Sequence, residues 1–457
     1  MMHVTPHAGR DALQPALDGF WELAGNKIQR LCESYPPELG APVFTVEGQY
    51  TARGWTEWTQ GFLYGLALLH FDATGDQRSL ELGRRGTVEH MASHLTHVGV
   101  HDHGFNNIST YGNLRRLMRE GRIAHDDWEM AAYEIALKAS GAVQAARWTP
   151  TADGGGFIYT FNGPHSLFVD TMRSLRSLSV AHQLGHRLMA EHDASISLLE
   201  RAMQHAWATA KWNVYYGEGR DAYDVRGRVV HEAIFNTNDG WFRCASTQQG
   251  YSPFSTWTRG LAWVMLGFAE QLEFVGQLPD AELDPLGGRA ELEGMMIRAA
   301  EAACDFYLEH TPTDGIPYWD TGAPGLAHHG DYLARPAEPL NEHEPVDSSA
   351  AAIGAQGLIR LGEALAARGS ADAARYRDAG VTILQRLLQP PYLSEDPEHQ
   401  GLLLHGIYHR PGGWDHVPAG RRVPSGESVM WGDYHLVELA LYVQRLINDE
   451  PYYAFFT

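Results

Sequence analysis

Apolar residues recur along most of the chain with the spacing of one helix face. Leu358, Leu361 and Leu365, for example, are three and four positions apart and share one side of a helix. Segments with this pattern each predict a helix. Their approximate bounds are 13–34, 56–73, 78–97, 104–119, 125–143, 167–184, 194–214, 255–276, 288–310, 347–367, 371–388 and 430–447.

The sequence predicts few strands. Only 156–161 and 228–235 have the character of strands, and strands do not alternate with helices, which disfavours a doubly wound sheet. The pattern therefore predicts an all-α protein with short β segments in its loops. Twelve helices suit six hairpins closed into a ring, although the pattern alone equally allows an open helical array.

The connections between several predicted helices are long and rich in Gly, Pro, Asp and His. They include 149–165, 311–346 and 389–429. Long loops in a compact protein usually carry function, so we expect these segments to build the site.

Composition narrows the class of protein. The chain has 457 residues, of which 44% are hydrophobic and 20% charged, as in ordinary globular proteins. Its net charge of −21 disfavours nucleic acid as a partner and repels anionic ligands at long range, so an acidic ligand needs local donors. The few, widely spaced cysteines (Cys32, Cys244 and Cys304) suit a reducing compartment. With no apolar leader core and no 18-residue apolar run, we expect a cytoplasmic protein that does not enter a membrane.

The segment QGYSPFSTWTRGLAW, residues 249–263, carries candidate binding chemistry. Arg259 and Trp263 are four apart on a predicted helix, where a guanidinium and an indole would hold a planar, carboxylated sugar. The alternative is an Arg that caps a loop and a Trp that fills the core. Asp102 and Asp170 also have an ordinary alternative, because an Asp at the start of a helix is most often a cap.

Several motifs together resemble a known family. In chain order they are Trp58-Thr-Gln-Gly-Phe62, His101-Asp-His-Gly-Phe105, Val169-Asp-Thr-Met172, His231, the run from Gln249 to Trp263, Gly315-Ile-Pro-Tyr-Trp-Asp320, Asp347-Ser-Ser-Ala-Ala351 and Trp431-Gly-Asp-Tyr434. Their order and spacing, from about residue 54 to 440, resemble the unsaturated glucuronyl hydrolases of glycoside hydrolase family 88 and the related family 105. Leu261 departs from the pattern, where the family usually has Gln.

The resemblance implies a fold and a reaction. The fold is an (α/α)6 barrel forming one catalytic domain over 1–457, with a helical lead-in over about 1–50. The reaction is hydration of the C4=C5 double bond in a 4,5-unsaturated uronic acid at the non-reducing end of an oligosaccharide. Neither a cofactor nor a metal is implied. Such a reaction needs one acid that then serves as a base for water.

Roles for individual residues follow from the resemblance. Asp170 is the acid/base, with a pKa raised by apolar surroundings, and Asp102 contacts the sugar hydroxyls and tunes Asp170. The expected substrate-binding residues are Trp58, His101, His231, Gln249, Arg259 and Trp263, with the two indoles stacking on the sugar ring.

Arg173 departs from the family, which usually continues Met-Asn-Leu-Pro where this chain has Met172-Arg-Ser-Leu175. It either faces the pocket, where its charge would lower the pKa of Asp170, or faces solvent. Two alternatives also remain open for Arg410, Arg421 and Arg422 in the loop 408–428. They either bind an anionic sugar next to the unsaturated uronic acid or face solvent.

A histidine series sits at helical spacing before Asp102. His90, His94, His97 and His101 would form a stripe on one helix, as in some metal sites. No Glu completes an H-E-x-x-H arrangement, so we expect no metal.

Competing functions remain open at this point. The nearest is a family 105-type hydrolase of unsaturated galacturonyl-rhamnose. Others are a sugar epimerase or polysaccharide lyase, and a non-catalytic sugar-binding protein. The sequence leaves both a monomer and a dimer open.

Overall fold

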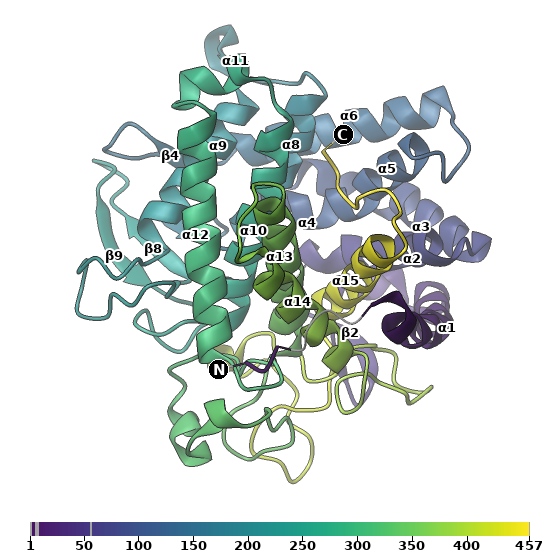
Figure 1. Cartoon of the computed structure of the whole chain (residues 1–457). Coiled ribbons are helices and arrows are strands. Elements are labelled where there is room, and N and C mark those ends of the chain that lie inside the picture. Colours follow the sequence, from purple (N-terminus) through teal and green to yellow (C-terminus); the bar gives the residue numbers. More distant parts are fainter. Residues whose placement is uncertain (1, 5–8, 55–56, 457) are drawn as a thin grey trace.

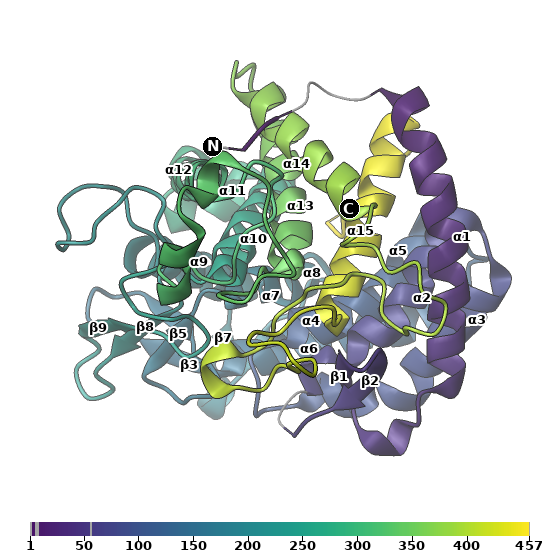
Figure 2. The same ribbon diagram turned by 90° about the horizontal axis from the view of Figure 1, so that it is seen from below.

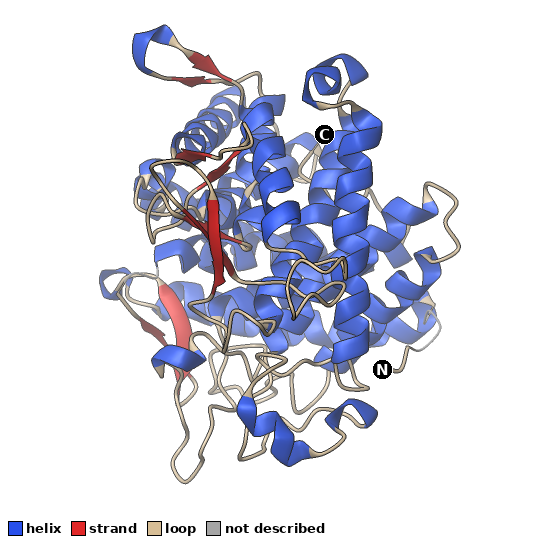
Figure 3. Ribbon diagram, turned by 90° about the vertical axis from the view of Figure 1, so that its left-hand side faces the viewer, coloured by secondary structure: helices blue, strands red, loops and turns tan. Residues whose placement is uncertain are grey.

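The computed structural model describes residues 2–4, 9–54 and 57–456 (Figure 1). Residues 1 and 5–8 of the predicted lead-in, and residue 56 at the start of the predicted helix 56–73, lie outside this part. Helices dominate, and strands are few and short (Figure 3). The helices are α1 Arg10–Ser34, α2 Gln60–Thr74, α3 Gln77–His90, α4 His103–Asn107, α5 Asn113–Arg119, α6 Asp127–Ala146, α7 Thr171–Ser174, α8 Arg176–Gln183, α9 Leu198–Trp212, α10 Thr258–Gln277, α11 Asp280–Leu283, α12 Arg289–His310, α13 Ser348–Ala366, α14 Ala373–Leu387 and α15 Met430–Ile447.

The strands form small antiparallel pairs and one three-stranded sheet. They are β1 Pro42–Val46, β2 Gln49–Ala52, β3 Trp148–Pro150, β4 Gly156–Ile158, β5 Ser166–Phe168, β6 Leu188–Met189, β7 Ser195–Ile196, β8 Glu232–Phe235 and β9 Phe242–Ser246. The predicted all-helical character with minor β segments is therefore confirmed.

The inner helices contact one another in a cyclic order. α2 packs on α15, α15 on α13, α13 on α10, α10 on α7, α7 on α4, and α4 on α2. α10, α13 and α15 are buried along almost their whole length, as expected for helices that are apolar on all sides. α1, α3, α6, α9, α12 and α14 pack against this inner set from outside, and α1 and α12 flank it in Figure 2.

The two ends of this helical arrangement differ. The long loops 311–346 and 389–429 gather at the lower end in Figure 1, whereas the chain after α15 runs toward the other end. Over the part of the chain that is described, no helix combines the length and the apolar character needed to cross a bilayer.

The predicted helix 78–97 ends early. α3 stops at His90 and a short 3-10 segment covers Ala92–Thr96. The tertiary contacts explain the break, because Asn106 and Asn107 of α4 donate hydrogen bonds to the His94 ring and carbonyl. The predicted histidine stripe on one helix is therefore wrong. No cluster of three or more potential metal ligands occurs among the described residues.

Two other predicted helices are interrupted. The segment 104–119 contains a π-helical turn, Ile108–Gly112, between α4 and α5. The segment 167–184 begins as strand β5, which pairs with β8, and only then becomes α7 and α8. The predicted strands are shorter than expected, and β1, β2, β3, β6, β7 and β9 were not predicted. Strands of two to five residues are too short to show a clear alternation of apolar and polar residues.

Glycines in two of the motifs let inner helices touch. A Cβ on Gly61 would lie 2.3 Å from the Asn106 carbonyl oxygen, and one on Gly104 would lie 2.3 Å from the Ser174 carbonyl oxygen. Any side chain at these positions would push α2, α4 and α7 apart. The motif glycines therefore serve close packing of the inner helices.

Arg173 lies in the protein interior, so both predicted alternatives, pocket and solvent, are wrong. Its side chain is fully buried and pairs with Glu270 and, at 2.7 Å, with Glu438. The charge is neutralised where it lies, because an unpaired buried cation would be very costly.

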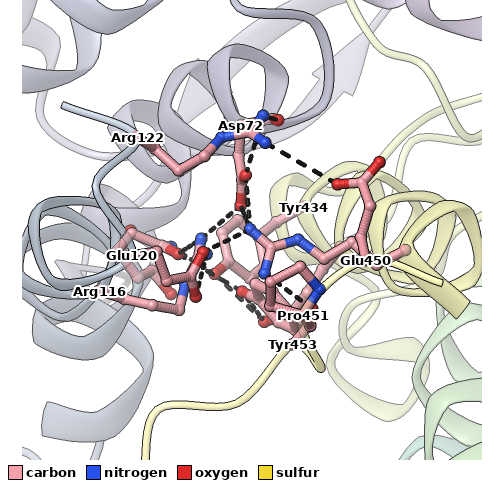
Figure 4. A network of polar contacts seen from close by, with 12 residues as sticks. Asp72, Arg116, Glu120, Arg122, Tyr434, Glu450, Pro451 and Tyr453 are labelled. Atoms are coloured by element: carbon pink, nitrogen blue, oxygen red, sulfur yellow. Dashed lines mark hydrogen bonds and ion pairs between the residues drawn. The ribbon is translucent and has the colours of Figure 1, made fainter. Parts of the chain in front are cut away.

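A neighbouring network joins Asp72 of α2 to two arginines. Asp72 accepts from Arg116 at 2.7 Å and from Arg445 at 2.6 Å, and Tyr453 of the C-terminal tail lies beside them (Figure 4). Helices α2, α5 and α15 are thus tied together by paired charges at this end of the inner set.

Candidate active site

A cavity of about 640 Å³ contains most of the predicted site residues. Those on its wall are Trp58, His101, Asp102, Asp170, Gln249, Arg259 and Trp263. His231 lies in the next layer, with its ring 4.3 Å from Phe168 and 4.7 Å from Trp257. Residues from five distant parts of the chain are therefore brought to one place, and the cavity is large enough for a disaccharide.

Asp102 and Asp170 occupy equivalent positions at the start of short helices. Each is the N-cap residue, of α4 and of α7, yet neither side chain makes a capping hydrogen bond. Both residues are buried, at 6% and 8% exposed, and both face the cavity. The alternative reading of each as an ordinary capping Asp is therefore wrong.

The His101 imidazole lies between the two carboxylates. Its Nε2 is 3.1 Å from Asp170 Oδ1 and 3.7 Å from Asp102 Oδ1. Burial alone would lower the pKa of His101, but the two negative charges outweigh it and raise that pKa above the ordinary value. A protonated His101 next to an ionised Asp170 is the arrangement this geometry favours.

The two carboxyl groups differ in their proton affinity. Burial alone would raise the pKa of Asp170, but the charge and hydrogen bond of His101 outweigh it and lower that pKa. Burial raises the pKa of Asp102 to about 6, and Asp170 adds to this rise against the opposing charge of His101. The expectation of a raised pKa at Asp170 therefore differs from the structure, because His101 donates to Asp170 directly.

The small sheet β5–β8–β9 places His231 beside Asp170. The Val169 amide, just before Asp170, donates to the His231 carbonyl at 3.1 Å. His231 Nδ1 accepts from the Gln248 amide at 3.1 Å and from the Gln249 amide at 3.4 Å. Nδ1 therefore carries no hydrogen, and burial lowers the pKa of His231 to about 3. A neutral ring with its hydrogen on Nε2 results.

The Arg259 guanidinium donates its hydrogen bonds to acceptors within the protein. Its terminal nitrogens donate to Asp347 at 3.0 Å, to Gln249 Oε1 at 2.8 Å, and to the carbonyls of Ile407 and Tyr408. Because Gln249 Oε1 accepts from Arg259, the Gln249 amide nitrogen is the group left to donate into the cavity.

The predicted pairing of Arg259 with Trp263 is not formed. The guanidinium lies over Trp257 at 4.5 Å and over Trp431 at 4.9 Å. Trp263 instead packs on Phe105, with ring centres 4.9 Å apart. Position in the first turn of α10 directs Arg259 toward the loops, whereas Trp263 points into the inner helices.

Aromatic side chains form much of the wall. Trp58 stacks on Trp431 with ring centres 4.9 Å apart, and its indole nitrogen donates to Tyr408 Oη at 3.3 Å. The prediction missed part of this wall, namely Phe105, Phe161, Asn162, Gln248, Trp257, Tyr408, His409 and Trp414. The available signal was the aromatic content of the long loops, which does not indicate which ring faces inward.

The loop arginines lie away from this wall. Arg421 pairs with Glu342 at 3.0 Å, and both side chains are partly exposed. None of Arg410, Arg421 and Arg422 belongs to the cavity lining. The loop 408–428 contributes Tyr408, His409 and Trp414 to the wall instead.

Comparison with known proteins finds relatives that cover most of the chain. The unsaturated glucuronyl hydrolase of Bacillus sp. strain GL1 is 26% identical over 421 residues, covering 88% of this chain and 90% of that protein. The one from Formosa agariphila is 24% identical over 394 residues, covering 86% and 81%. The chain is similar to the unsaturated glucuronyl hydrolases along most of its length. Its resemblance to that family in sequence motifs is thereby confirmed, although no family model matches the chain.

Solved structures of unsaturated glucuronyl hydrolases share the fold. A crystal structure of one specific for heparin superposes with a TM-score of 0.72 at 20% identity, covering 95% of this chain and 98% of that one. The structure from Bacillus sp. GL1 gives a TM-score of 0.71 at 23% identity, covering 95% and 97%. An unsaturated chondroitin disaccharide hydrolase of Streptococcus pyogenes is also similar in sequence, at 24% identity over 443 residues, covering 94% and 92%.

Proposed function

We propose that this protein is a glycoside hydrolase that hydrates the C4=C5 bond of a 4,5-unsaturated uronic acid and releases that sugar from an oligosaccharide. The observation that carries the proposal is the pair Asp102 and Asp170 around one buried imidazole, in an aromatic-walled cavity. The relatives named as hydrolases of unsaturated glucuronyl and chondroitin sugars support it.

The chemistry needs a proton donor and a water activator on one substrate face. The unsaturated sugar is a vinyl ether, so a proton added at C4 builds positive charge at C5, next to the ring oxygen. Water then adds at C5 and loses a proton to a base. The resulting hemiketal opens, and the bond to the remaining oligosaccharide breaks. One carboxyl group performs both proton transfers, giving up a proton first and taking one from water afterwards.

Asp170 is the residue we assign to both transfers, and Asp102 to hydrogen bonding with the sugar hydroxyls. Asp170 lies next to a donor, His101 Nε2, that restores its proton. Trp58 and Trp263 on the wall would stack on the sugar ring, as aromatic faces do with sugars.

The net charge of −21 repels an anionic substrate at long range. Recognition of the uronate carboxylate therefore depends on hydrogen-bond donors in the cavity itself. We assign it to the Gln249 amide nitrogen at the cavity wall, with Arg259 holding the Gln249 side chain and His231, in the layer behind, accepting from the Gln249 backbone amide. Neutral N–H donors in a buried site bind a carboxylate strongly because little water competes.

We also propose that the helices form six hairpins closed as an (α/α)6 barrel, acting as one catalytic domain over 1–457 in the cytoplasm. The cyclic contact order of α2, α4, α7, α10, α13 and α15 supports the closure. The packing of α1 against α2 and α3 supports counting the N-terminal segment with this domain.

The test is turnover of unsaturated disaccharides prepared with lyases from heparin, chondroitin and rhamnogalacturonan. Loss of ultraviolet absorbance reports disappearance of the double bond. We expect turnover by wild type and a loss of about 10²-fold or more in Asp170→Asn. Asp305→Asn, the same chemical change on the outer helix α12, is the matched control and should keep wild-type rates.

The panel also separates the alternatives. Preference for the galacturonyl-rhamnose substrate would indicate the family 105-type specificity. Binding without absorbance loss on every substrate would refute the hydrolase proposal and favour a sugar-binding protein, and a gain of absorbance on intact polysaccharide would favour a lyase.

A further inference from the structure

His101 was expected to bind sugar, yet its contacts point inward. It is 1% exposed, and its ring packs against Phe161 and Phe168, with ring centres 6.1 Å and 5.7 Å away. Its carbonyl accepts from Gln144 Nε2 and from Ser174 Oγ, each at 2.8 Å. Backbone and ring are thus held in place from α6, α7 and β5, with little freedom to follow a ligand.

The ring orientation determines where a proton sits. Nε2 faces Asp170 and Asp102, whereas Nδ1 has no hydrogen-bond partner among the described residues. A carboxylate only accepts, so Nε2 must donate to Asp170. The imidazole N–H therefore donates to Asp170, while Asp102 lies 3.7 Å from the same nitrogen and influences it through its charge. A proton on Nε2 is the only one within hydrogen-bond distance of the Asp170 carboxylate among the described residues.

The groups around His101 come from several elements. Those that influence its charge are Asp102, Asp170, Arg147, His205 and His231. Burial lowers the pKa of both His205 and His231 to about 3, so these two rings stay neutral. Arg147 opposes a charge on His101, and the two carboxylates favour it. Among these groups, only His101, Asp102 and Asp170 are placed to exchange a proton near neutral pH.

We infer that His101 is a positioning residue that stores the catalytic proton on Nε2 and exchanges it with Asp170 during the reaction. The inference rests on the proposed hydration. His101 gives its Nε2 proton to Asp170, and Asp170 passes that proton to C4 of the substrate. After water adds at C5, Asp170 takes a proton from that water and returns one to His101. The sum is one hydrogen at C4 and one hydroxyl at C5, with the protein restored.

The kinetic test compares His101→Gln and His101→Asn with wild type on the disaccharide that wild type turns over fastest. Gln keeps an amide N–H near the position of Nε2 but cannot release a proton, and Asn removes the donor. We expect kcat to fall by about 10²-fold or more in both, with KM near the wild-type value. The alkaline limb of the pH profile should move to lower pH, because the proton must then reside on carboxyl groups alone.

His70→Gln is the matched control, since it also removes a buried imidazole. His70 lies on α2, and its ring is bonded to Ser79 and to the Trp21 carbonyl. It should keep the wild-type pH profile. Recovery of wild-type kcat in His101→Gln, or a rise in KM with an unshifted profile, would show that His101 only supports structure or binds sugar, and would overturn the inference.

A second measurement is independent of turnover. In histidine-labelled protein, NMR follows the protonation of His101, assigned by its loss in His101→Gln. We expect it to stay protonated above the ordinary histidine range, about 6.5, and Asp170→Asn to lower its titration midpoint. Titration at or below that range, or no response to Asp170→Asn, would refute the inference. If no unsaturated sugar is turned over, the titrations of wild type and Asp170→Asn still decide where the proton resides.

Discussion

Arg259 Nη1 lies 3.0 Å from Asp347 Oδ2, which joins the first turn of α10 to the N-cap of α13. The other oxygen of Asp347 accepts from the Ser349 amide at 3.1 Å, so one carboxylate both caps a helix and fixes a guanidinium. Through Arg259, the same pair fixes Gln249 at the cavity wall. Two motifs separated by almost ninety positions thus act together on one binding residue.

Arg259→Lys should weaken substrate binding more than catalysis. A lysine keeps the charge but cannot satisfy the four acceptors that the guanidinium reaches in its planar fork. We expect KM to rise about tenfold or more, the effect of losing roughly 1.5–3 kcal/mol of hydrogen bonding to a charged group. Steady-state kinetics measure this. Arg421→Lys, at an exposed pair with Glu342, should leave KM unchanged. An equal, small effect of both variants would count against the proposed role.

Gly104→Ala should destabilise the fold through a steric clash. The new Cβ would sit 2.3 Å from the Ser174 carbonyl oxygen, which belongs to backbone and cannot rotate away. The free energy of unfolding should fall by about 1–3 kcal/mol, and urea unfolding with circular dichroism measures it. Gly294→Ala in α12 meets no atom within 4 Å and should raise stability by about 0.5–1 kcal/mol. A stabilised Gly104→Ala variant would contradict the close helix contact.

Acid should remove stability that Glu438 supplies. Burial alone would raise the pKa of Glu438, but the charges of Arg173 and Arg176 outweigh it and lower that pKa to about 2. The unfolded-state value is near 4.3, so the contribution is complete above that pH and is lost as pH falls toward 2. The contribution of Glu438 to the free energy of unfolding is about 3 kcal/mol, and urea unfolding between pH 2 and 6 measures its loss.

Glu438→Gln should remove this pH dependence and destabilise the protein near pH 7, by roughly 3–5 kcal/mol, because buried arginines lose a partner. Glu291→Gln, an exposed site on α12, provides the comparison and should behave as wild type. Equal steepness of the acid transition in wild type and Glu438→Gln would exclude Glu438 as its source.

Phe455→Ala should destabilise the protein although it lies at the end of the chain. Phe455 is 4% exposed and lies in the same tail as Tyr453, whose hydroxyl is 3.1 Å from Glu438 Oε1. Removal of a buried phenyl ring costs about 3–5 kcal/mol. Trp128→Ala removes a larger ring that is 87% exposed and should change stability by less than about 0.5 kcal/mol. Thermal unfolding of the two variants measures the difference, and similar melting temperatures would contradict a structural role for the tail.

Local pattern was enough to locate most of the helices. The predicted 288–310, 347–367 and 430–447 agree with α12, α13 and α15 to within a residue or two, because long helices repeat their apolar spacing many times. The break after His90 escaped prediction, since it depends on hydrogen bonds from Asn106 and Asn107, which a periodic pattern does not contain. The paired strands β1 and β2 were not predicted either, because their pairing also depends on hydrogen bonds that a periodic pattern does not contain.

The site also has features that the sequence predicted and features that it did not. Motifs and their order were sufficient to name Asp102, Asp170 and His231 as neighbours, because these residues match the motif pattern of the unsaturated glucuronyl hydrolases. Arg173 was misplaced because only the folded chain brings Glu270 and Glu438 to it. The protonation of His101 and of the two carboxyl groups also depends on contacts between distant parts of the chain. His101 is the residue just before Asp102 in sequence, yet its Nε2 lies closer to Asp170.

The sequence by itself determined the helical character, the identity of the candidate carboxylates and the resemblance to the unsaturated glucuronyl hydrolases, since these depend on residue type, order and spacing. Only the tertiary structure decided which donors remain available and which carboxyl group holds a proton. Those properties depend on distances between side chains far apart in the chain, and on burial, which strengthens every charge interaction that water would otherwise screen.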